Sequence, residues 1–359
     1  MAQVIREFES HRFRQMLGFA YVVARMQTQR QGRGNLTASA NIHCFSNKPE
    51  AIAPFTAGDS DFLTTCYTFY YGRLSRIPVL LTATNHDRDI TGMTYVYPVV
   101  SRRAGGVSVG VNLNPNNACN WACVYCQVPN LVRGTAPPID LAQLESELRQ
   151  MLDAIVHGDF MQTHVDADMR RLNDIALSGN GEPTSAREFD LVIDLIGKLL
   201  AEFGLLGKIK LVLITNGSLI SRKQVQAGLR AMAALNGEVW FKLDSATAAG
   251  MRATNQTRIV PDKAFEKLGI CAALCPTWLQ TCVFALDGVA PSDAEQAAYL
   301  QWVQRICEAQ IPVRGVLLYG LARPSMQPQA PRLSALPAAW LEDFAQRIRA
   351  AGLPVQVSV

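Results

Sequence analysis

The sequence predicts an α/β protein whose core is an incomplete barrel of six βα units, open on one side. Three observations lead to this prediction. From about Val107 onward, short apolar strands alternate with amphipathic helices, which is the pattern of parallel βαβ units. Polar or glycine-rich turns follow several of these strands, so the carboxyl ends of the strands can share one functional edge. Six units are fewer than a closed eight-unit barrel needs, and an open barrel suits a large substrate.

Length and composition indicate a soluble globular protein. The chain has 359 residues, of which 49% are apolar and 18% charged, enough for one large domain or two. A net charge of +4 permits a nucleic-acid partner without arguing for one. No apolar run is long enough to span a bilayer, so we expect a cytoplasmic protein with no membrane partner. Nine cysteines, an odd and scattered set, suit a reducing compartment with a metal site better than a disulfide framework.

Residues 1–78 differ from the rest of the chain. They lack a sustained period of 3.6 or 2 and carry nine Lys and Arg against five Asp and Glu. We expect a poorly structured, disordered N-terminal extension. A second hypothesis is that this segment is translated from a misassigned start, with Val79 as the alternative initiation residue. The predicted core then covers residues 79–332, and residues 333–359 form a C-terminal helix and an extended tail packed on the core.

The first predicted βα unit begins with an alternating strand over 107–113, which leads directly into a cysteine-rich loop. A helix follows, capped by Asp140 with Gln143 three residues later, and Gly158 ends it. The insert 159–173 is predicted to be a loop with a partly helical stretch. The second strand, 175–177, runs into a glycine-rich turn.

The remaining elements repeat this alternation. Ser185 and Glu188 form a predicted capping box at the start of the next helix, and Ser221 begins the one after it. Strand 209–214 is a continuous apolar run of the kind buried on both faces. The last predicted elements are strands 239–244, 279–286 and 313–319, helix 294–309, a helix through Trp340, Phe344 and Ile348, and an extended end at 355–359.

The cysteine-rich loop carries the strongest chemical signal. Cys119, Cys123 and Cys126 follow a C-x3-C-x2-C spacing, and three thiols within eight residues can close on one metal centre at small entropic cost. This set is one ligand short of a closed site. A four-iron cluster held by three thiolates leaves one iron open, where a substrate or cosubstrate can bind.

Two further sets of residues lie at predicted strand ends. Gly179 and Gly181 let the backbone approach a ligand closely, although a plain strand-to-helix connection would use glycines too. Lys242 and Asp244 lie on the same face of their strand because strand residues alternate. They can hold the carboxylate and ribose of a nucleoside cosubstrate, which makes them the predicted catalytic residues. The alternative is a buried ion pair that only fills the barrel.

These motifs together resemble those of the radical S-adenosylmethionine (SAM) enzymes, whose fold is a partial TIM barrel. The resemblance covers Gly92 to the C-terminus and includes an aromatic residue, Tyr125, just before the last cysteine. It implies a [4Fe-4S] cluster on the three cysteines, SAM chelating the open iron, and an electron donor such as flavodoxin or ferredoxin. It also implies that reductive cleavage of SAM gives methionine and a 5′-deoxyadenosyl radical, which takes hydrogen from a substrate. The residues it assigns to SAM are Tyr125, Gly179, Asn180, Gly181, Glu182, Thr215, Asn216, Lys242 and Asp244.

Within this superfamily the motifs look like the branch of the wyosine-base synthases of tRNA. Those enzymes condense pyruvate with N1-methylguanosine, and they carry a second cluster on three upstream cysteines together with a lysine that forms a Schiff base. This chain has only Cys44 and Cys66 upstream, with Lys48 as the sole lysine there. The sequence therefore predicts a radical SAM enzyme of unknown substrate, with a wyosine-type reaction on tRNA as the alternative.

Two other hypotheses remain. The first is a zinc-bound RNA-binding module, in which the three cysteines and a fourth ligand close a tetrahedral site. Zinc sites favour paired C-x2-C knuckles, and no matching second pair occurs in the sequence. The second is another cluster on Cys271, Cys275 and Cys282, whose spacing is similar to a metal pattern. Buried, inert cysteines are the alternative explanation of that spacing.

Overall fold

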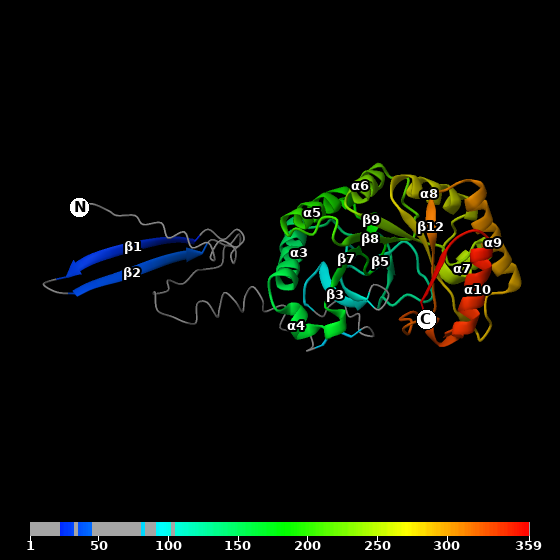
Figure 1. The fold of residues 1–359 in the computed structure, drawn as a ribbon, viewed down its shortest axis with the longest axis horizontal. Helices are drawn as coiled ribbons and strands as arrows, with labels where there is room; N and C mark the ends of the chain where they lie inside the picture. The colour runs from blue at the N-terminus through cyan, green and yellow to red at the C-terminus, as the bar shows by residue number, and fades with distance from the viewer. Residues whose placement is uncertain (1–21, 32–34, 45–79, 83–90, 102–104, 359) are drawn as a thin grey trace. The chain divides into compact units, whose positions relative to one another are not determined.

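The computed structural model describes residues 22–31, 35–44, 80–82, 91–101 and 105–358. The chain divides into two units, Met1–Gly72 and Arg73–Val359. In the first unit the described residues form an antiparallel hairpin of β1 (Val22–Gln31) and β2 (Asn35–Cys44) (Figure 1). This hairpin lies within the segment for which the sequence predicts disorder. Residues 1–21, 32–34 and 45–78 of that segment lie outside the described residues. Val79, on which the hypothesis of a misassigned start depends, lies outside them too.

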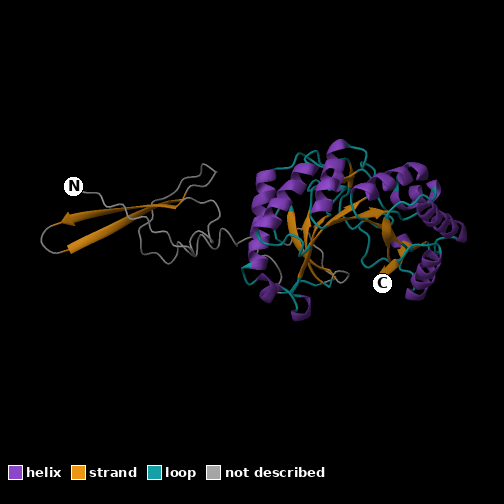
Figure 2. Cartoon of the chain, turned by 45° about the horizontal axis from the view of Figure 1, so that its top comes forward, coloured by secondary structure: helices purple, strands orange, loops and turns teal. Residues whose placement is uncertain are grey.

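One eight-stranded sheet organises the second unit (Figure 2). All neighbouring strands pair in parallel except β3 and β4, which are antiparallel. The predicted α/β class with a parallel sheet is therefore confirmed. In spatial order the strands are β14 (Val355–Ser358), β12 (Val313–Tyr319), β10 (Thr277–Cys282), β9 (Gly237–Lys242), β8 (Lys210–Thr215), β7 (Leu172–Leu177), β4 (Gly106–Val111) and β3 (Val96–Ser101).

Helices line the outer side of this curved sheet (Figures 1 and 2). Each main helix buries an apolar stripe, as the helical period of its sequence predicts. Strand β4 is buried along its whole length, which explains its apolar composition on both faces. The helices are α3 (Leu141–Val156), α4 (Phe160–His164), α5 (Phe189–Glu202), α6 (Lys223–Ala234), α7 (Ala248–Asn255), α8 (Pro261–Leu274), α9 (Asp293–Glu308) and α10 (Ala338–Ala350).

The sheet is larger than the six predicted strands. The four-residue strand β14, predicted only as an extended end, pairs in parallel with β12 and becomes a seventh parallel strand. The predicted strand 279–286 is two elements, β10 and the short β11 (Ala285–Leu286), and β11 pairs with β13 (Leu333–Ser334) instead. Helices α7 and α8 were not predicted at all. Strands β11, β13 and β14 carry too few residues to show a period, so their pairing partners decide them.

Of three helix starts predicted from capping signals, one is confirmed and two lie at other residues. Asp140 caps α3 as predicted, with its side chain accepting a hydrogen bond from Gln143 N at 3.0 Å. The capping box predicted at Ser185 is wrong, because α5 begins only at Phe189. The Ser185 hydroxyl instead accepts a hydrogen bond from Ala136 N at 2.8 Å. The start predicted at Ser221 is also displaced, since α6 begins at Lys223 without a side-chain cap.

None of the helices in the described part of the chain is both long and apolar enough to cross a bilayer.

Candidate functional site

The three predicted metal ligands share one loop at the carboxyl edge of the sheet. Strand β4 ends at Val111, and the chain then passes through the two-residue strand β5 (Ala118–Cys119). Strand β5 pairs in parallel with β6 (Val132–Arg133), which closes the base of the loop. The thiols of Cys119, Cys123 and Cys126 are all free, and each residue is half-buried. We call residues 119–126 the cysteine loop.

The end of α7 holds one side of the cysteine loop. Val124 N donates a hydrogen bond to Thr254 O at 2.8 Å, and Ala122 N donates to Asn255 O at 3.2 Å. The side chain of Asn255 reaches further and donates from Nδ2 to Cys123 Sγ at 3.2 Å. No sequence pattern identified Asn255, because none predicted a helix at this position.

A segment that follows β12 holds the other side of the loop. Ser325 Oγ donates to Val124 O at 2.7 Å, and Met326 N donates to Cys126 O at 2.9 Å. The contacts satisfy carbonyl groups that the irregular loop leaves without a partner in a helix or strand. No sequence motif signals this role for Ser325.

Burial affects the thiols directly. It raises the pKa of Cys119 to about 11 and the pKa of Cys123 to about 12. Both groups are therefore protonated at neutral pH, and a metal centre that binds them must displace their protons. Three sulfur donors on one partly enclosed loop fit the ligand chemistry of an iron–sulfur cluster. Within the described residues, no three His, Cys, Asp or Glu side chains are gathered as ligands of a single metal ion.

The glycine turn packs tightly against the chain before the cysteine loop. A Cβ atom at Gly181 would lie 2.0 Å from Ala118 O, and one at Gly179 would lie 2.3 Å from Asn112 Oδ1. Asn180 N donates to the same Asn112 oxygen at 3.0 Å. Close packing is thus sufficient to require both glycines, as in the plainer of the two interpretations. Their contact with a ligand stays a prediction.

Glu182 occupies a position between two strand ends. The residue is 2% exposed, and its carboxylate accepts hydrogen bonds from Thr184 N, Thr184 Oγ1, Thr215 Oγ1 and Asn216 N at 2.6–3.2 Å. Burial raises the pKa of Glu182 and outweighs these hydrogen bonds, which lower it. Because its acceptor positions are used within the protein, the side chain ties the turn after β7 to the turn after β8. Thr215 and Asn216, predicted as cofactor-binding residues, belong to this network.

Asp244 lies next to the cysteine loop. Its carboxylate accepts hydrogen bonds from Tyr125 Oη at 2.5 Å, Asn255 Nδ2 at 2.6 Å and Cys282 N at 2.9 Å. Tyr125 and Asp244, both predicted as SAM-binding residues, are therefore in direct contact. Through these contacts Asp244 joins the loop, α7 and β10.

Lys242 lies two residues earlier, at the end of β9. Its Nζ is 5.1 Å from the centre of the Tyr125 ring and donates to Tyr319 Oη at 3.3 Å. Burial alone would lower the pKa of Lys242, but Tyr319 and the Asp244 carboxylate raise it above the ordinary value. Lys242 is therefore an ammonium group held between aromatic rings, beside the cysteine loop.

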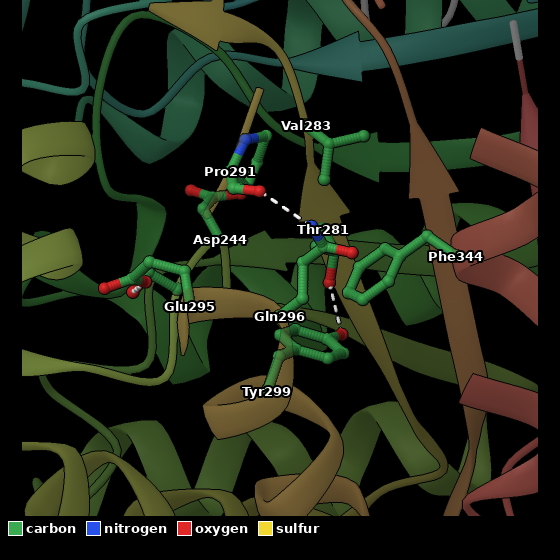
Figure 3. Close-up of a pocket in the computed structure, with 9 residues that line it drawn as sticks. Asp244, Thr281, Val283, Pro291, Glu295, Gln296, Tyr299 and Phe344 are labelled. Carbon is green, nitrogen blue, oxygen red and sulfur yellow. Dashed lines mark hydrogen bonds between the residues drawn. The ribbon is translucent and has the colours of Figure 1, made fainter. Parts of the chain in front are cut away.

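A cavity that Asp244 helps to line is too small for a cosubstrate (Figure 3). Its volume of about 30 Å³ matches one or two water molecules. Figure 3 shows Thr281 and Tyr299 joined by a hydrogen bond across it, at 2.6 Å. The cavity belongs to the packing between the sheet and α9.

The second set of cysteines is not arranged as one site. Cys275 lies just before β10 and Cys282 lies at its end, so the strand separates them by roughly 20 Å at about 3.3 Å per residue. All three residues of the set are buried. The alternative of buried, inert cysteines explains Cys271 and Cys275, whereas Cys282 borders the Asp244 site.

Comparison with known proteins gives few relatives in sequence. No protein-family model matches the chain. The UPF0026 protein MJ1312 of Methanocaldococcus jannaschii is 30% identical over 172 residues, which are 47% of this chain and 46% of that protein. The GTPase Obg of Brachyspira hyodysenteriae is 23% identical over 152 residues, 42% of this chain and 20% of that protein. The chain thus covers less than half the length of either relative.

The fold is more informative. A radical SAM methyltransferase from Sphaerobacter thermophilus aligns with a TM-score of 0.52 over 84% of each chain, at 15% sequence identity. The chain shares the fold of a radical SAM enzyme. The cysteine loop of this chain lies at the carboxyl edge of that shared sheet, with Lys242 and Asp244 beside it.

Proposed function

We propose that this protein is a radical SAM enzyme that holds a [4Fe-4S] cluster on Cys119, Cys123 and Cys126. Its reaction is the reductive cleavage of SAM, followed by abstraction of a hydrogen atom from a substrate that is not yet known. The observation that carries the proposal is the cysteine loop itself. Three free, half-buried thiols lie on one loop at the carboxyl edge of a sheet of this fold.

The bound cluster would supply one electron to SAM and so generate a 5′-deoxyadenosyl radical. The chain's own residues would bind the cluster and enclose it. The thiolates of Cys119, Cys123 and Cys126 would hold three irons of the cluster, and the hydrogen bonds from α7 and from Ser325 keep the loop in place. Burial around the loop excludes water, which strengthens the polar interactions that would position SAM.

Lys242 and Asp244 are proposed to orient SAM. The Lys242 ammonium can bind the carboxylate of the methionine moiety, and Asp244 can accept a hydrogen bond from a ribose hydroxyl. The glycine turn, Gly179 to Glu182, is proposed to face the methionine amino group through its backbone, since the Glu182 side chain is engaged within the protein. Tyr125 is proposed to pack beside the cluster, and a flavodoxin or ferredoxin to deliver the electron.

The narrower assignment to wyosine synthesis on tRNA depends on the sequence motifs alone. No observation in the described residues favours tRNA over another substrate. The proposed function is therefore the radical SAM reaction without a named substrate.

The decisive experiment is iron and sulfide analysis with EPR spectroscopy of the anaerobically reconstituted, reduced protein, without and with SAM. We expect about four irons per chain and a spectrum that changes when SAM is added. About eight irons per chain would indicate a second cluster and would favour the wyosine-type reaction as the function. Bound zinc with no response to SAM would overturn the proposal in favour of a zinc-binding module.

A further inference from the structure

Asn255 contacts a proposed cluster ligand and a proposed SAM-binding residue with one side chain. Its Nδ2 lies 3.2 Å from Cys123 Sγ and 2.6 Å from Asp244 Oδ2, and the residue is 1% exposed. A primary amide carries two N–H groups, so each acceptor receives one. The amide thus stands between two groups that are both negatively charged when a cluster is bound, Cys123 and Asp244.

The position of this amide is fixed by its backbone. Asn255 is the last residue of α7, and Gln256 after it adopts a left-handed conformation with φ of 51°. The carbonyl groups of Thr254 and Asn255 accept hydrogen bonds from the cysteine loop. These backbone contacts hold the Asn255 Cα beside the loop, and a side chain that turned away from Cys123 would also lose its hydrogen bond to Asp244.

We propose that Asn255 is a positioning residue that raises the reduction potential of the cluster held by Cys123. This inference rests on the proposed function. Reduction adds negative charge that spreads onto the ligand sulfurs, and an N–H donor to a sulfur stabilises the more negative state. The amide makes the cluster easier to reduce.

The surroundings explain why such a donor is useful. The carboxyl end of α7 carries a partial negative charge and points at the cysteine loop, and the Asp244 carboxylate lies on the far side of the amide. Both negative charges make it less favourable to add an electron to a cluster held by Cys123. Lys242 acts in the opposite sense but donates its hydrogen bond to Tyr319, away from the sulfur. The Asn255 amide, by contrast, donates directly to the Cys123 sulfur.

The test is the midpoint potential of the reconstituted cluster, measured by anaerobic redox titration and EPR without SAM. Asn255→Leu has nearly the same size and no N–H donor. We expect its midpoint to shift to a more negative value, and each tenfold loss in the reduction equilibrium corresponds to 59 mV for a one-electron couple. An unchanged midpoint in a protein that binds four irons would overturn the inference.

Arg133→Lys is the matched control. Arg133 also joins the loop to the end of α7, since its guanidinium donates to Asn120 O and to Gln256 O. Lysine keeps the positive charge but cannot bridge both carbonyl groups, so this variant loosens the same contact without touching sulfur. We expect a midpoint close to that of the wild type. An equal shift in both variants would assign the effect to a loosened loop and reject the role of the amide.

A second measurement uses the wild-type protein alone, in case Asn255→Leu fails to bind iron. Asparagine labelled with ¹⁵N is incorporated, and pulsed EPR of the reduced protein should detect a nitrogen coupled to the cluster. Absence of that coupling would overturn the inference. If the wild type itself holds no cluster, the proposed function fails first, and the inference fails with it. If the wild type holds a cluster and shows no coupling, only the inference fails.

Discussion

At the scale of single residues, Glu182 shows how a predicted ligand residue can serve the fold. The sequence places it at the end of a glycine turn, where the resemblance assigns it to SAM. In the structure its carboxylate is buried and accepts hydrogen bonds from Thr184, Thr215 and Asn216. Both oxygens are engaged, so the side chain joins the ends of β7 and β8. A substitution of Glu182 can therefore distinguish a structural role of its side chain from a role as a SAM ligand.

Glu182→Gln should destabilise the protein. The amide nitrogen of glutamine would face N–H and O–H donors, so the variant loses charge-assisted hydrogen bonds in a buried place. We expect the free energy of unfolding to fall by about 3 kcal/mol, as measured by urea denaturation. Unchanged stability combined with lost SAM binding would instead identify the side chain as a SAM ligand.

Asp174 is a buried acid far from the cysteine loop, near the start of β7. Ser108 donates a hydrogen bond to it, and it lies near Glu238 and Lys210. Burial raises the pKa of Asp174 from 3.8 to about 6, with a further contribution from Glu238, against the lowering effects of Ser108 and Lys210. The folded protein therefore holds this proton to a higher pH than the unfolded chain does.

The stability of the protein should consequently depend on pH through this group. Its contribution favours folding below about pH 4 and is lost as the pH rises through 6, a difference of about 3 kcal/mol. Asp174→Asn should remove that part of the pH dependence in urea denaturation between pH 4 and 7. The exposed Asp343→Asn is the control and should leave the profile unchanged. A wild-type slope retained in Asp174→Asn would contradict the assignment.

At the scale of elements, the glycine turn and the cysteine loop pack directly on each other. Gly181 approaches Ala118 O so closely that no side chain fits. The turn can therefore move only together with the chain that leads into the loop. The same contact gives a test that compares two glycines in different surroundings.

Gly181→Ala should displace the turn from the loop, because its Cβ would lie 2.0 Å from Ala118 O. We expect destabilisation of about 2 kcal/mol and a lower iron content after reconstitution. Gly269→Ala is the matched control, since the new Cβ on α8 would meet Ile311 at an ordinary 3.7 Å. Alanine should stabilise α8 by about 0.5 to 1 kcal/mol. Equal effects of the two changes on thermal unfolding would contradict the packing argument.

Sequence patterns predicted the elements unevenly, for physical reasons. The strand over 209–214 and the helix capped by Asp140 were found because burial on both faces and a side-chain cap leave local signals. Helix α7 has only eight residues, and β14 only four, so neither shows a period. Missing α7 also meant missing Asn255. The cysteine spacing predicted the loop, but nothing local predicts which distant segments hold it.

At the scale of the whole molecule, the sheet and its helices form a core that does not depend on the thiols. The largest fully buried side chains lie outside the cysteine loop, for example Phe189, Phe241 and Leu148. Hydrophobic burial of this extent supplies most of the folding free energy. The fold should therefore exist without the cluster.

Cys123→Ala tests that independence. We expect the variant to lose iron binding while keeping its far-UV circular dichroism and a cooperative thermal transition, because the sheet keeps its core. Iron analysis and a thermal melt give the two readouts. If the variant were unfolded, the cluster would be a structural element of the core, and the division between scaffold and site would be wrong.

The contacts that hold the cysteine loop also set an order of events during protein synthesis. Ser325 contacts Val124 across 201 residues of chain, and Asn255 contacts Cys123 across 132. At translation rates of about 5–20 residues per second, roughly 10 to 40 s pass between the appearance of the loop and that of Ser325. During this interval the thiols are made but their enclosure is not. We expect them to be open to oxidants and to competing metals then, so the moment of iron delivery matters as much as its supply.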